Sequence, residues 1–431
     1  MLINIVISNK YEGIDFDGYS PMYQMQLVAW MRQRGYLCVP TKGDLIDDAD
    51  LIVLIVQYPH ESDEPWFNEC LSRASSKQKV ILSGKAATID RKRLISVFRR
   101  VDFIIVGEPF KTLASVVTNI NSLNDDITIP GLLFLNDRGE CIETEQQNAL
   151  TDYDEVPIAS QRYLTDKENS ISIHYMETSY ECHGKCNFCS GLVYRNLIPG
   201  CNRYMSAERI VNEIKYMNNK YNIKVFVFYD ENFFLDNDYG YVRAKEFARL
   251  LEKANLRIRF TIECRADNIH YDIINYLKSV GLYTVFVGIE SGSRAVLDRY
   301  HKHISLEQNH TALQILRKLK VRCRPGYIFF DPLTTKNELQ ESIELFEEYS
   351  DILYVHKQDN NGLLWFPAES AIVKYMHEHG VDVHDSYTSY PFVHEETRNI
   401  YKKLQYLKKN AAIQNNKMNG LIALLKSAIV I

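Results

Sequence analysis

The stretch ECHGKCNFCS, residues 181–190, decides how the rest of the chain is interpreted. It holds three cysteines, Cys182, Cys186 and Cys189, at the spacing C-x3-C-x2-C. Thiolates bind iron–sulfur clusters, and a closed [4Fe–4S] site uses four of them. Three ligands in one compact loop leave one iron open, and an open metal position is where chemistry takes place. Gly184 is expected to let the backbone turn tightly between the first two ligands.

The loop resembles the signature of the radical S-adenosylmethionine (radical SAM) enzymes, where it follows the first strand of a partial (β/α) barrel. An apolar, β-prone run precedes it here, at 171–176. The resemblance implies a [4Fe–4S] cluster whose open iron binds SAM and whose electron splits it into methionine and a 5′-deoxyadenosyl radical. It also implies that Phe188 lies near the adenine. The spacing alone leaves a zinc knuckle, or three structural cysteines, as the alternative.

Length and composition bound the class of protein. A chain of 431 residues can hold two or three domains, and 46% hydrophobic with 24% charged residues is typical of a globular protein. The net charge of −5 gives no indication of a nucleic-acid partner. The start of the chain lacks the features of a signal peptide, and no apolar run is long enough for a membrane span. Nine cysteines without a secretion signal favour a reducing cytoplasm.

Residues 1–145 alternate short apolar strands with helices. This alternation predicts an α/β, Rossmann-like parallel sheet with helices on both faces. The strands are expected at 3–7, 36–39, 51–56, 80–82 and 103–106. Because G-x-G-x-x-G and P-loop motifs are absent, neither a dinucleotide nor a nucleoside triphosphate site is indicated.

The order of these pieces resembles the cobalamin(B12)-binding domain that precedes many radical SAM barrels. SGKAAT at 83–88 stands where that family has Gly-Gly-x-His-Ala-Thr, and GEPF at 107–110 stands where it has Gly-Glu-Gly-Glu. The Asp-x-His-x-x-Gly motif of histidine-ligating domains is absent, and some glycines are replaced. The fold is therefore expected, while cobalamin as a cofactor stays open. His60, the one histidine of this domain, is either ligand-facing or an exposed loop residue.

The remaining chain predicts a linker, a barrel and a cap. Residues 146–170 are polar and are expected to form the linker. Residues 171–365 repeat β-loop-α units, which predicts an open (β/α)6 radical SAM barrel with strands at 171–176, 225–229, 258–262, 284–289, 327–330 and 352–356. Residues 366–431 predict a C-terminal helical region, with an apolar last helix packed on the body. In such barrels the active site lies at the carboxyl ends of the strands.

Three of these strand ends resemble the SAM-binding turns of the family. They are YDENF at 229–233, ECRAD at 263–267 and GIESGS at 288–293. The resemblance implies that SAM contacts Tyr229, Asp230, Glu231, Glu263, Arg265, Gly288, Glu290 and Ser291. Arg265 suits a carboxylate because its planar fork can bind two oxygens. Ser291 is also expected to cap the following helix. Each acidic residue alone could equally be a solvated helix start or one half of a salt bridge.

The last two strand ends depart from the family pattern. A glycine-rich turn is replaced around Asp331, and the sixth strand is followed by HKQDNN at 356–361. Asp331, His356, Lys357 and Asp359 are therefore predicted to be acid–base residues that face a small polar substrate. His356 and Lys357 are alternatively ordinary residues of the barrel rim.

Together these features predict a radical SAM enzyme that abstracts hydrogen from a small polar metabolite. A sugar or aminocyclitol of a natural-product pathway would fit, with dehydration, epimerisation, oxidation or rearrangement as the outcome. The reductant implied is flavodoxin or ferredoxin. The alternative is a cobalamin-dependent radical SAM methyltransferase. A second alternative is a non-catalytic iron–sulfur protein, which would need a fourth cluster ligand and no SAM pocket.

Overall fold

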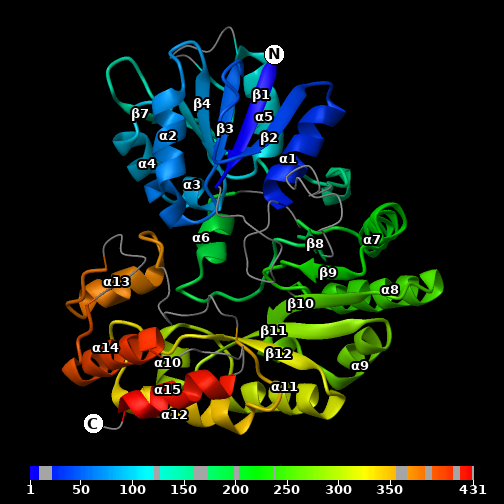
Figure 1. Cartoon of the computed structure of the whole chain (residues 1–431), viewed down its shortest axis with the longest axis vertical. Helices are drawn as coiled ribbons and strands as arrows, with labels where there is room; N and C mark the ends of the chain where they lie inside the picture. Colours follow the sequence, from blue (N-terminus) through cyan, green and yellow to red (C-terminus); the bar gives the residue numbers. More distant parts are fainter. Residues whose placement is uncertain are drawn as a thin grey trace. The chain divides into compact units, whose positions relative to one another are not determined.

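The structure is a computed structural model, and it describes residues 1–8, 22–120, 127–159, 173–198, 203–235, 238–355, 366–383, 391–410 and 418–429. The chain divides into two compact units. The first comprises Met1–Tyr175 with the segments Val193–Met205 and Lys220–Ile223, and the second comprises Met176–Leu192, Ser206–Asn219 and Lys224–Ile431. Each unit is built on a sheet of its own (Figure 1).

The first unit contains a seven-stranded sheet in the order β2-β1-β3-β4-β5-β6-β7. The strands are β1 (Leu2–Ile7), β2 (Leu37–Lys42), β3 (Leu51–Ile55), β4 (Lys79–Ser83), β5 (Phe103–Ile105), β6 (Leu132–Leu135) and β7 (Cys141–Glu143). β1 to β5 pair in parallel, whereas β6 and β7 are antiparallel. The strand order reverses at β1, and ligands of such sheets bind beyond the carboxyl ends at this switch point.

Helices cover both faces of this sheet (Figure 1). They are α1 (Met22–Gln33), the 3-10 helix η1 (Pro59–Asp63), α2 (Pro65–Arg73), α3 (Lys85–Ile89), α4 (Arg91–Val97) and α5 (Pro109–Thr118). Alternate strand residues such as Ile52 and Leu54 pack against Trp66 and Phe67 of α2. On the other face α1 lies beside α5, and Trp30 Nε1 donates to the carbonyl of Phe110.

The five-stranded sheet holds the barrel strands, in the order β12-β11-β10-β9-β8; β9 to β12 belong to the second unit, and the division of the chain falls within β8, after Tyr175. They are β8 (Ile173–Met176), β9 (Val225–Phe228), β10 (Arg259–Arg265), β11 (Leu282–Glu290) and β12 (Arg322–Tyr327), and β9 to β12 pair in parallel. The helices that alternate with them are α6 (Ser190–Asn196), α7 (Ala207–Tyr221), α8 (Asp238–Ala254), α9 (Tyr271–Ser279), α10 (Arg294–Arg299), α11 (Leu306–Leu319) and α12 (Lys336–Glu348). The predicted α/β class is confirmed.

Two predicted strands of the barrel are corrected by the structure. The fifth strand was expected at 327–330 but spans Arg322–Tyr327, because it pairs in register with β11 from Thr284 onward. The sixth was expected at 352–356, and its described part forms only an isolated parallel bridge between Leu353 and Cys323. The described sheet therefore has five strands and the beginning of a sixth.

The C-terminal region consists of α13 (Ala371–Glu378), α14 (Glu395–Asn410) and α15 (Met418–Ile429). The expected apolar last helix is α15, which packs against α12 and α14 and pairs Lys426 with Glu347. In the parts of the chain that the structure describes, no helix combines the length and the apolar character that crossing a bilayer requires.

Candidate functional site

The cysteine loop runs between β8 and α6 in the second unit. Cys186 is buried, whereas Cys182 and Cys189 are half-buried. A tight turn closes the loop, with the Cys189 N–H donating to the Cys186 carbonyl at 3.1 Å. The N–H of Gly184 also points at the Cys182 sulfur, 3.4 Å away. N–H groups directed at a sulfur stabilise its thiolate form, which is the form that binds iron.

Gly184 is required for space rather than for an unusual backbone conformation. Its φ is not among the positive values found for the described glycines. A Cβ at this position would lie 2.5 Å from Nη1 of Arg265 and 3.3 Å from the Cys182 sulfur. The missing side chain therefore lets the Arg265 guanidinium enter between the ligands, where Nη1 is 3.7 Å from the Cys186 sulfur.

The three cysteines suit a cluster better than a single ion. Among the described side chains, no group of three or more His, Cys, Asp or Glu residues is gathered closely enough to hold one metal ion. A zinc knuckle needs its sulfurs to converge at about 2.3 Å from one point. A [4Fe–4S] cluster instead takes one thiolate on each of several irons. The adjacent guanidinium also complements the negative charge that thiolates and a reduced cluster carry.

Two further described cysteines, Cys264 and Cys323, lie in β10 and β12 within the barrel core. Burial raises the pKa of both thiols well above its ordinary value. Cys201 lies outside the described residues.

Asp230 anchors the segment that enters the cysteine loop. Its side chain is buried and accepts hydrogen bonds from the Thr178 N–H at 2.5 Å, the Thr178 hydroxyl at 2.6 Å and the Ser179 N–H at 2.9 Å. Burial raises the pKa of Asp230, and the nearby Arg243 and these donors oppose that effect. The carboxylate that was predicted to contact SAM therefore binds the protein's own loop.

Asp267 anchors the middle of the loop. Its carboxylate receives two bonds of 3.0 Å from Arg265 and lies 3.5 Å from Nε2 of His183, which follows Cys182. Burial alone would raise the pKa of Asp267, but His183 and Arg265 together lower it to about 2. Asp267 belongs to the ECRAD turn, but no pattern in that turn indicates that Asp267 joins Arg265 to the loop.

Glu290 and Lys302 form a buried ion pair at the end of β11. Lys302 Nζ lies 2.7 Å from Glu290 Oε1. Glu290 has a φ of 64°, a left-handed conformation that is uncommon for a residue with a side chain. A Cβ on Gly288 would lie 2.6 Å from Lys302 Nζ and 2.7 Å from Glu290 Oε1, so this glycine makes room for the pair.

The other residues predicted to bind SAM have the following local contacts. Phe188 packs edge-on against Tyr300, with ring centroids 4.9 Å apart. The Glu231 carboxylate lies against Gly191, the second residue of α6. Tyr229 and Glu263 are half-buried at the ends of neighbouring strands. Ser291 does not cap α10, whose N-cap is Ser293; its hydroxyl instead contacts the Ser342 hydroxyl at 2.7 Å.

The predicted acid–base residues have different outcomes. Asp331 is fully buried and is held by Arg299 and Tyr300. His356, Lys357 and Asp359 lie outside the described residues, and their roles stay predictions.

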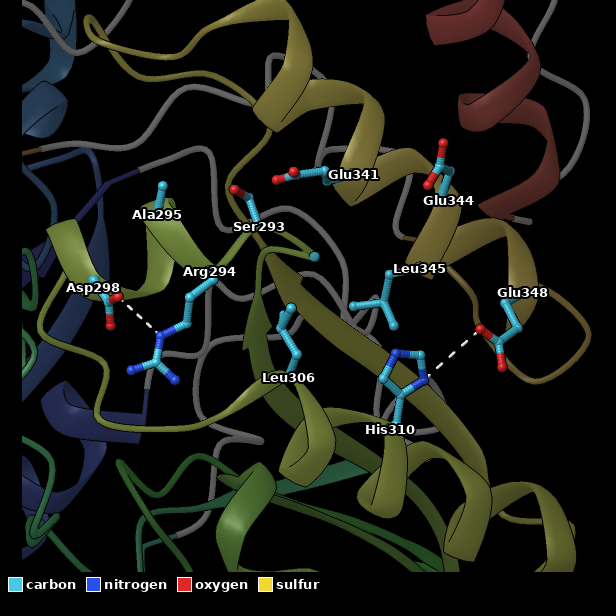
Figure 2. A pocket seen from close by; sticks show the side chains of 11 residues that line it. Ser293, Arg294, Ala295, Asp298, Leu306, His310, Glu341, Glu344, Leu345 and Glu348 are labelled. Atoms are coloured by element: carbon cyan, nitrogen blue, oxygen red, sulfur yellow. Dashed lines mark hydrogen bonds and ion pairs between the residues drawn. The ribbon is translucent and has the colours of Figure 1, made fainter.

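A hollow of about 720 Å³ lies on the outer side of α10, α11 and α12 (Figure 2). Carboxylates line it, from Asp298, Glu341, Glu344 and Glu348, and none of the cysteines or predicted SAM ligands does. In Figure 2, Asp298 points toward Arg294 and His310 toward Glu348. This hollow is separate from the site formed by the cysteine loop.

The carboxyl edge of the first unit's sheet carries a second candidate site. The hydroxyls of Tyr23 and Ser83 lie 3.2 Å apart there. Gly107 has a φ of 92°, and the three atoms nearest to a Cβ built on it all belong to the Ile198 side chain. Gly84 has a φ of 118°, and its Cβ would lie 2.5 Å from the Val56 carbonyl oxygen. His60 lies 3.6 Å from Glu64, with about a third of its side chain exposed.

Comparison with known proteins assigns the class of the second unit. Residues 176–346 match the model of the radical SAM superfamily, so the chain carries a radical SAM domain, as the cysteine spacing predicted. Domains of this superfamily use a [4Fe–4S] cluster and SAM, and the curated relatives carry the names of enzymes.

Curated relatives match part of the chain. An uncharacterized methyltransferase of Pyrococcus horikoshii is 25% identical over 281 residues, which cover 64% of this chain and 59% of that protein. The 4′-phospho-dehydrooxetanocin synthase of Priestia megaterium is 26% identical over 51% of this chain and 32% of that enzyme. The chain thus matches a third to three fifths of the length of these relatives.

Solved structures match nearly the whole chain in fold. The cobalamin-dependent radical SAM enzyme OxsB, with aqua-cobalamin and SAM bound, superposes with a TM-score of 0.71 at 17% identity over 95% of this chain and 67% of that one. The radical SAM methyltransferase TsrM of Kitasatospora setae gives a TM-score of 0.70 at 14% identity over 90% and 79%. The predicted arrangement of a B12-binding-like fold followed by a radical SAM barrel is thereby confirmed as a fold.

Proposed function

We propose that this protein is a cobalamin-dependent radical SAM enzyme that transfers a methyl group to a small polar substrate. The observation that carries the proposal is the fold similarity, which spans both units and 95% of the chain, to an enzyme with aqua-cobalamin and SAM bound. The methyltransferase names of one relative and of TsrM favour methyl transfer over the direct hydrogen abstraction expected from the sequence.

In this proposal Cys182, Cys186 and Cys189 hold the cluster. When bound, the cluster supplies the electron that cleaves SAM reductively. Arg265 lies beside Cys186 and is already oriented by Asp267. Its positive charge lies beside the ligand thiolates, and both cations near the loop already have a carboxylate partner, Asp267 for Arg265 and Glu290 for Lys302. The SAM contacts that we propose are Tyr229, Glu231, Glu263, Glu290 and Phe188.

Cobalamin would be held at the carboxyl edge of the first unit's sheet, and it supplies a carrier for methyl groups. The residues of that edge fit such a ligand in two respects. Gly107 leaves the backbone without a side chain after β5, where the Ile198 side chain lies against it, and the Tyr23 and Ser83 hydroxyls can bond to amide groups. The need for glycine at position 84 is explained without a bound ligand, because the Val56 backbone fills the space that a Cβ of residue 84 would occupy.

Direct adenosyl-radical chemistry on a polar metabolite is the second candidate. It is favoured by one specific observation, the relative named as a synthase rather than as a methyltransferase. In either case a low-potential donor such as flavodoxin or ferredoxin would reduce the cluster, and nine cysteines with an oxygen-sensitive cofactor suit the cytoplasm.

The test begins with anaerobic reconstitution with iron and sulfide. The full-length protein is then incubated with hydroxocobalamin, desalted and examined by visible spectroscopy. We expect about four irons per chain, together with corrin bands close to one per chain. Wild type without corrin bands would overturn the cobalamin proposal and leave the second candidate.

Product analysis then separates the two reactions. With SAM and reductant, the proposed methyl transfer consumes SAM in two ways and gives S-adenosylhomocysteine, 5′-deoxyadenosine with methionine, and a methylated product. Hydrogen abstraction alone gives 5′-deoxyadenosine and methionine without S-adenosylhomocysteine or methylation. Cys186→Ala is the control and should abolish iron uptake and SAM cleavage together. A wild type that binds iron but never cleaves SAM would support the non-catalytic alternative.

A further inference from the structure

The second half of the cysteine loop rests on the end of α10. Asn187, between Cys186 and Cys189, donates from its backbone N–H to the Tyr300 carbonyl at 3.1 Å. Its side-chain amide donates to the Arg299 carbonyl at 2.8 Å. Carbonyls at a helix end lack partners within the helix, so Asn187 satisfies two of these acceptors. The loop is thereby tied to a segment 112 residues away in sequence.

Tyr300 contacts the loop in a second way. Its ring is the partner of Phe188, at 4.9 Å between centroids and an interplanar angle of 64°. Tyr300 has no exposed surface, so its ring position is set by the surrounding packing. The two residues between Cys186 and Cys189 therefore both depend on where the end of α10 lies.

Asp331 fixes that end. One of its oxygens accepts hydrogen bonds from Nη2 of Arg299 at 3.0 Å and from the Tyr300 hydroxyl at 2.7 Å. The other oxygen accepts the Leu333 N–H at 2.6 Å. Glu338 of α12 holds the same guanidinium at 2.9 Å. A buried carboxylate with this many donors is a rigid point, because every alternative position would leave buried donors unsatisfied.

We propose that Asp331 is a positioning residue for the cluster-binding loop. It acts through Arg299 and Tyr300 on Asn187, and so sets the separation and direction of Cys186 and Cys189. This inference rests on the proposed cluster but assigns Asp331 a role other than acid–base chemistry. That role agrees with its complete burial and with its bonds to two residues of the α10 end.

Three variants interrupt the connection at different points. Tyr300→Phe removes one hydroxyl and keeps the ring against Phe188, and Asp331→Asn weakens the bonds to Arg299 and Tyr300. Asn187→Ala removes the side-chain bond from the loop to the Arg299 carbonyl. Asp298→Asn is the matched control, because it lies on α10 but its carboxylate faces Arg294 at the surface (Figure 2).

The readout is the cluster itself rather than turnover. Each full-length variant is reconstituted anaerobically, and the rate of iron release to a chelator is measured with the electron paramagnetic resonance spectrum of the reduced cluster, with and without SAM. We expect release about fivefold faster in the three variants, the change given by losing one hydrogen bond of ordinary strength. Their spectra should shift or broaden, while Asp298→Asn matches wild type.

A double variant tests whether Tyr300 and Asn187 act on the cysteine loop through one shared connection. Tyr300→Phe and Asn187→Ala remove different bonds of the same connection, so the double variant should release iron little faster than either single variant. Release rates and spectra of Tyr300→Phe and Asp331→Asn that equal those of the control would overturn the inference. If Asp331→Asn fails to fold, Tyr300→Phe decides alone. A wild type that takes up no iron would overturn the proposed function as well.

Discussion

The ammonium of Lys302 lies 2.7 Å from a carboxylate oxygen of Glu290, and the two side chains are only 6% and 11% exposed. Burial alone would lower the pKa of Lys302, but Glu290 and then Cys186 raise it above its ordinary value. The lysine therefore stays charged inside the barrel. A buried charge without its partner is costly, so each member of this pair depends on the other.

Replacing Lys302 by methionine should accordingly destabilise the apo-protein by about 3–5 kcal/mol, because it leaves the Glu290 carboxylate buried and unpaired. Thermal unfolding measures the effect. Lys336→Met, which breaks the surface pair with Glu396, is the control and should cost below about 1 kcal/mol. Adding Glu290→Gln to Lys302→Met should recover much of the loss. Equal losses in both lysine variants would contradict this prediction.

Gly184→Ala should reduce the amount of cluster that the protein binds. The added methyl would lie 2.5 Å from the Arg265 guanidinium, so either the guanidinium or the loop must move. Iron content after reconstitution is the measurement. Gly420→Ala in α15 is the matched control, since a Cβ there meets no atom within 4 Å. Undiminished iron in Gly184→Ala would show that the loop tolerates the displacement.

The stabilising effect of Asp267 should depend on acid pH. Its pKa is lowered to about 2 in the folded protein, against an unfolded value of about 3.9. A lowered carboxyl pKa stabilises the fold above the unfolded value, by ~2 kcal/mol here, and this contribution is lost as pH falls toward the folded value. The difference in thermal midpoint between wild type and Asp267→Asn should therefore be constant from pH 5 to 7, in the plateau above the unfolded pKa, and shrink below about pH 4. A difference that stays constant in acid would refute the assignment.

Asp230→Ala should loosen the entry to the cysteine loop. The substitution leaves the Thr178 and Ser179 N–H groups buried without their acceptor, at about 1–3 kcal/mol for each group. Hydrogen exchange of these two amides should accelerate, whereas the amides of β11 keep the rate of wild type. Thr178→Val removes only the hydroxyl bond and should give a smaller effect. Slow exchange in Asp230→Ala would mean that other contacts hold this segment.

Local patterns in the sequence were sufficient to predict much of this protein. The spacing of Cys182, Cys186 and Cys189 predicted the radical SAM domain, and alternating apolar runs placed β1, β3, β4 and β9 to β11 within a few residues. These predictions succeed because ligand spacing and the apolar pattern of buried parallel strands are both visible in short segments of the sequence.

The contacts that shape the site could not be predicted in this way. Lys302 and Asn187 carry no local signal, since their partners are fixed by the tertiary fold. The fifth strand was expected too late in the chain, because Arg322, Arg324 and Pro325 lack the apolar pattern of a strand, whereas the run that follows them has it. Pairing with β11 overrides that local preference. Asp331 was predicted to be an acid–base residue facing the substrate, and its complete burial could not be inferred from the sequence.

The residues that anchor the cysteine loop are translated later than the loop itself. Asp230, Asp267 and Tyr300 with Asp331 all follow the loop in the chain, by roughly 50 to 150 residues. During synthesis the three cysteines therefore leave the ribosome well before anything exists to hold them. Since chains are synthesised at about 5–20 residues per second, the segment that carries the cysteines lacks its full set of tertiary contacts for several seconds at least. We therefore expect the cluster to be assembled only after residue 331 has been translated. A truncated chain that ends earlier would expose the three thiols without all of the residues that hold the loop.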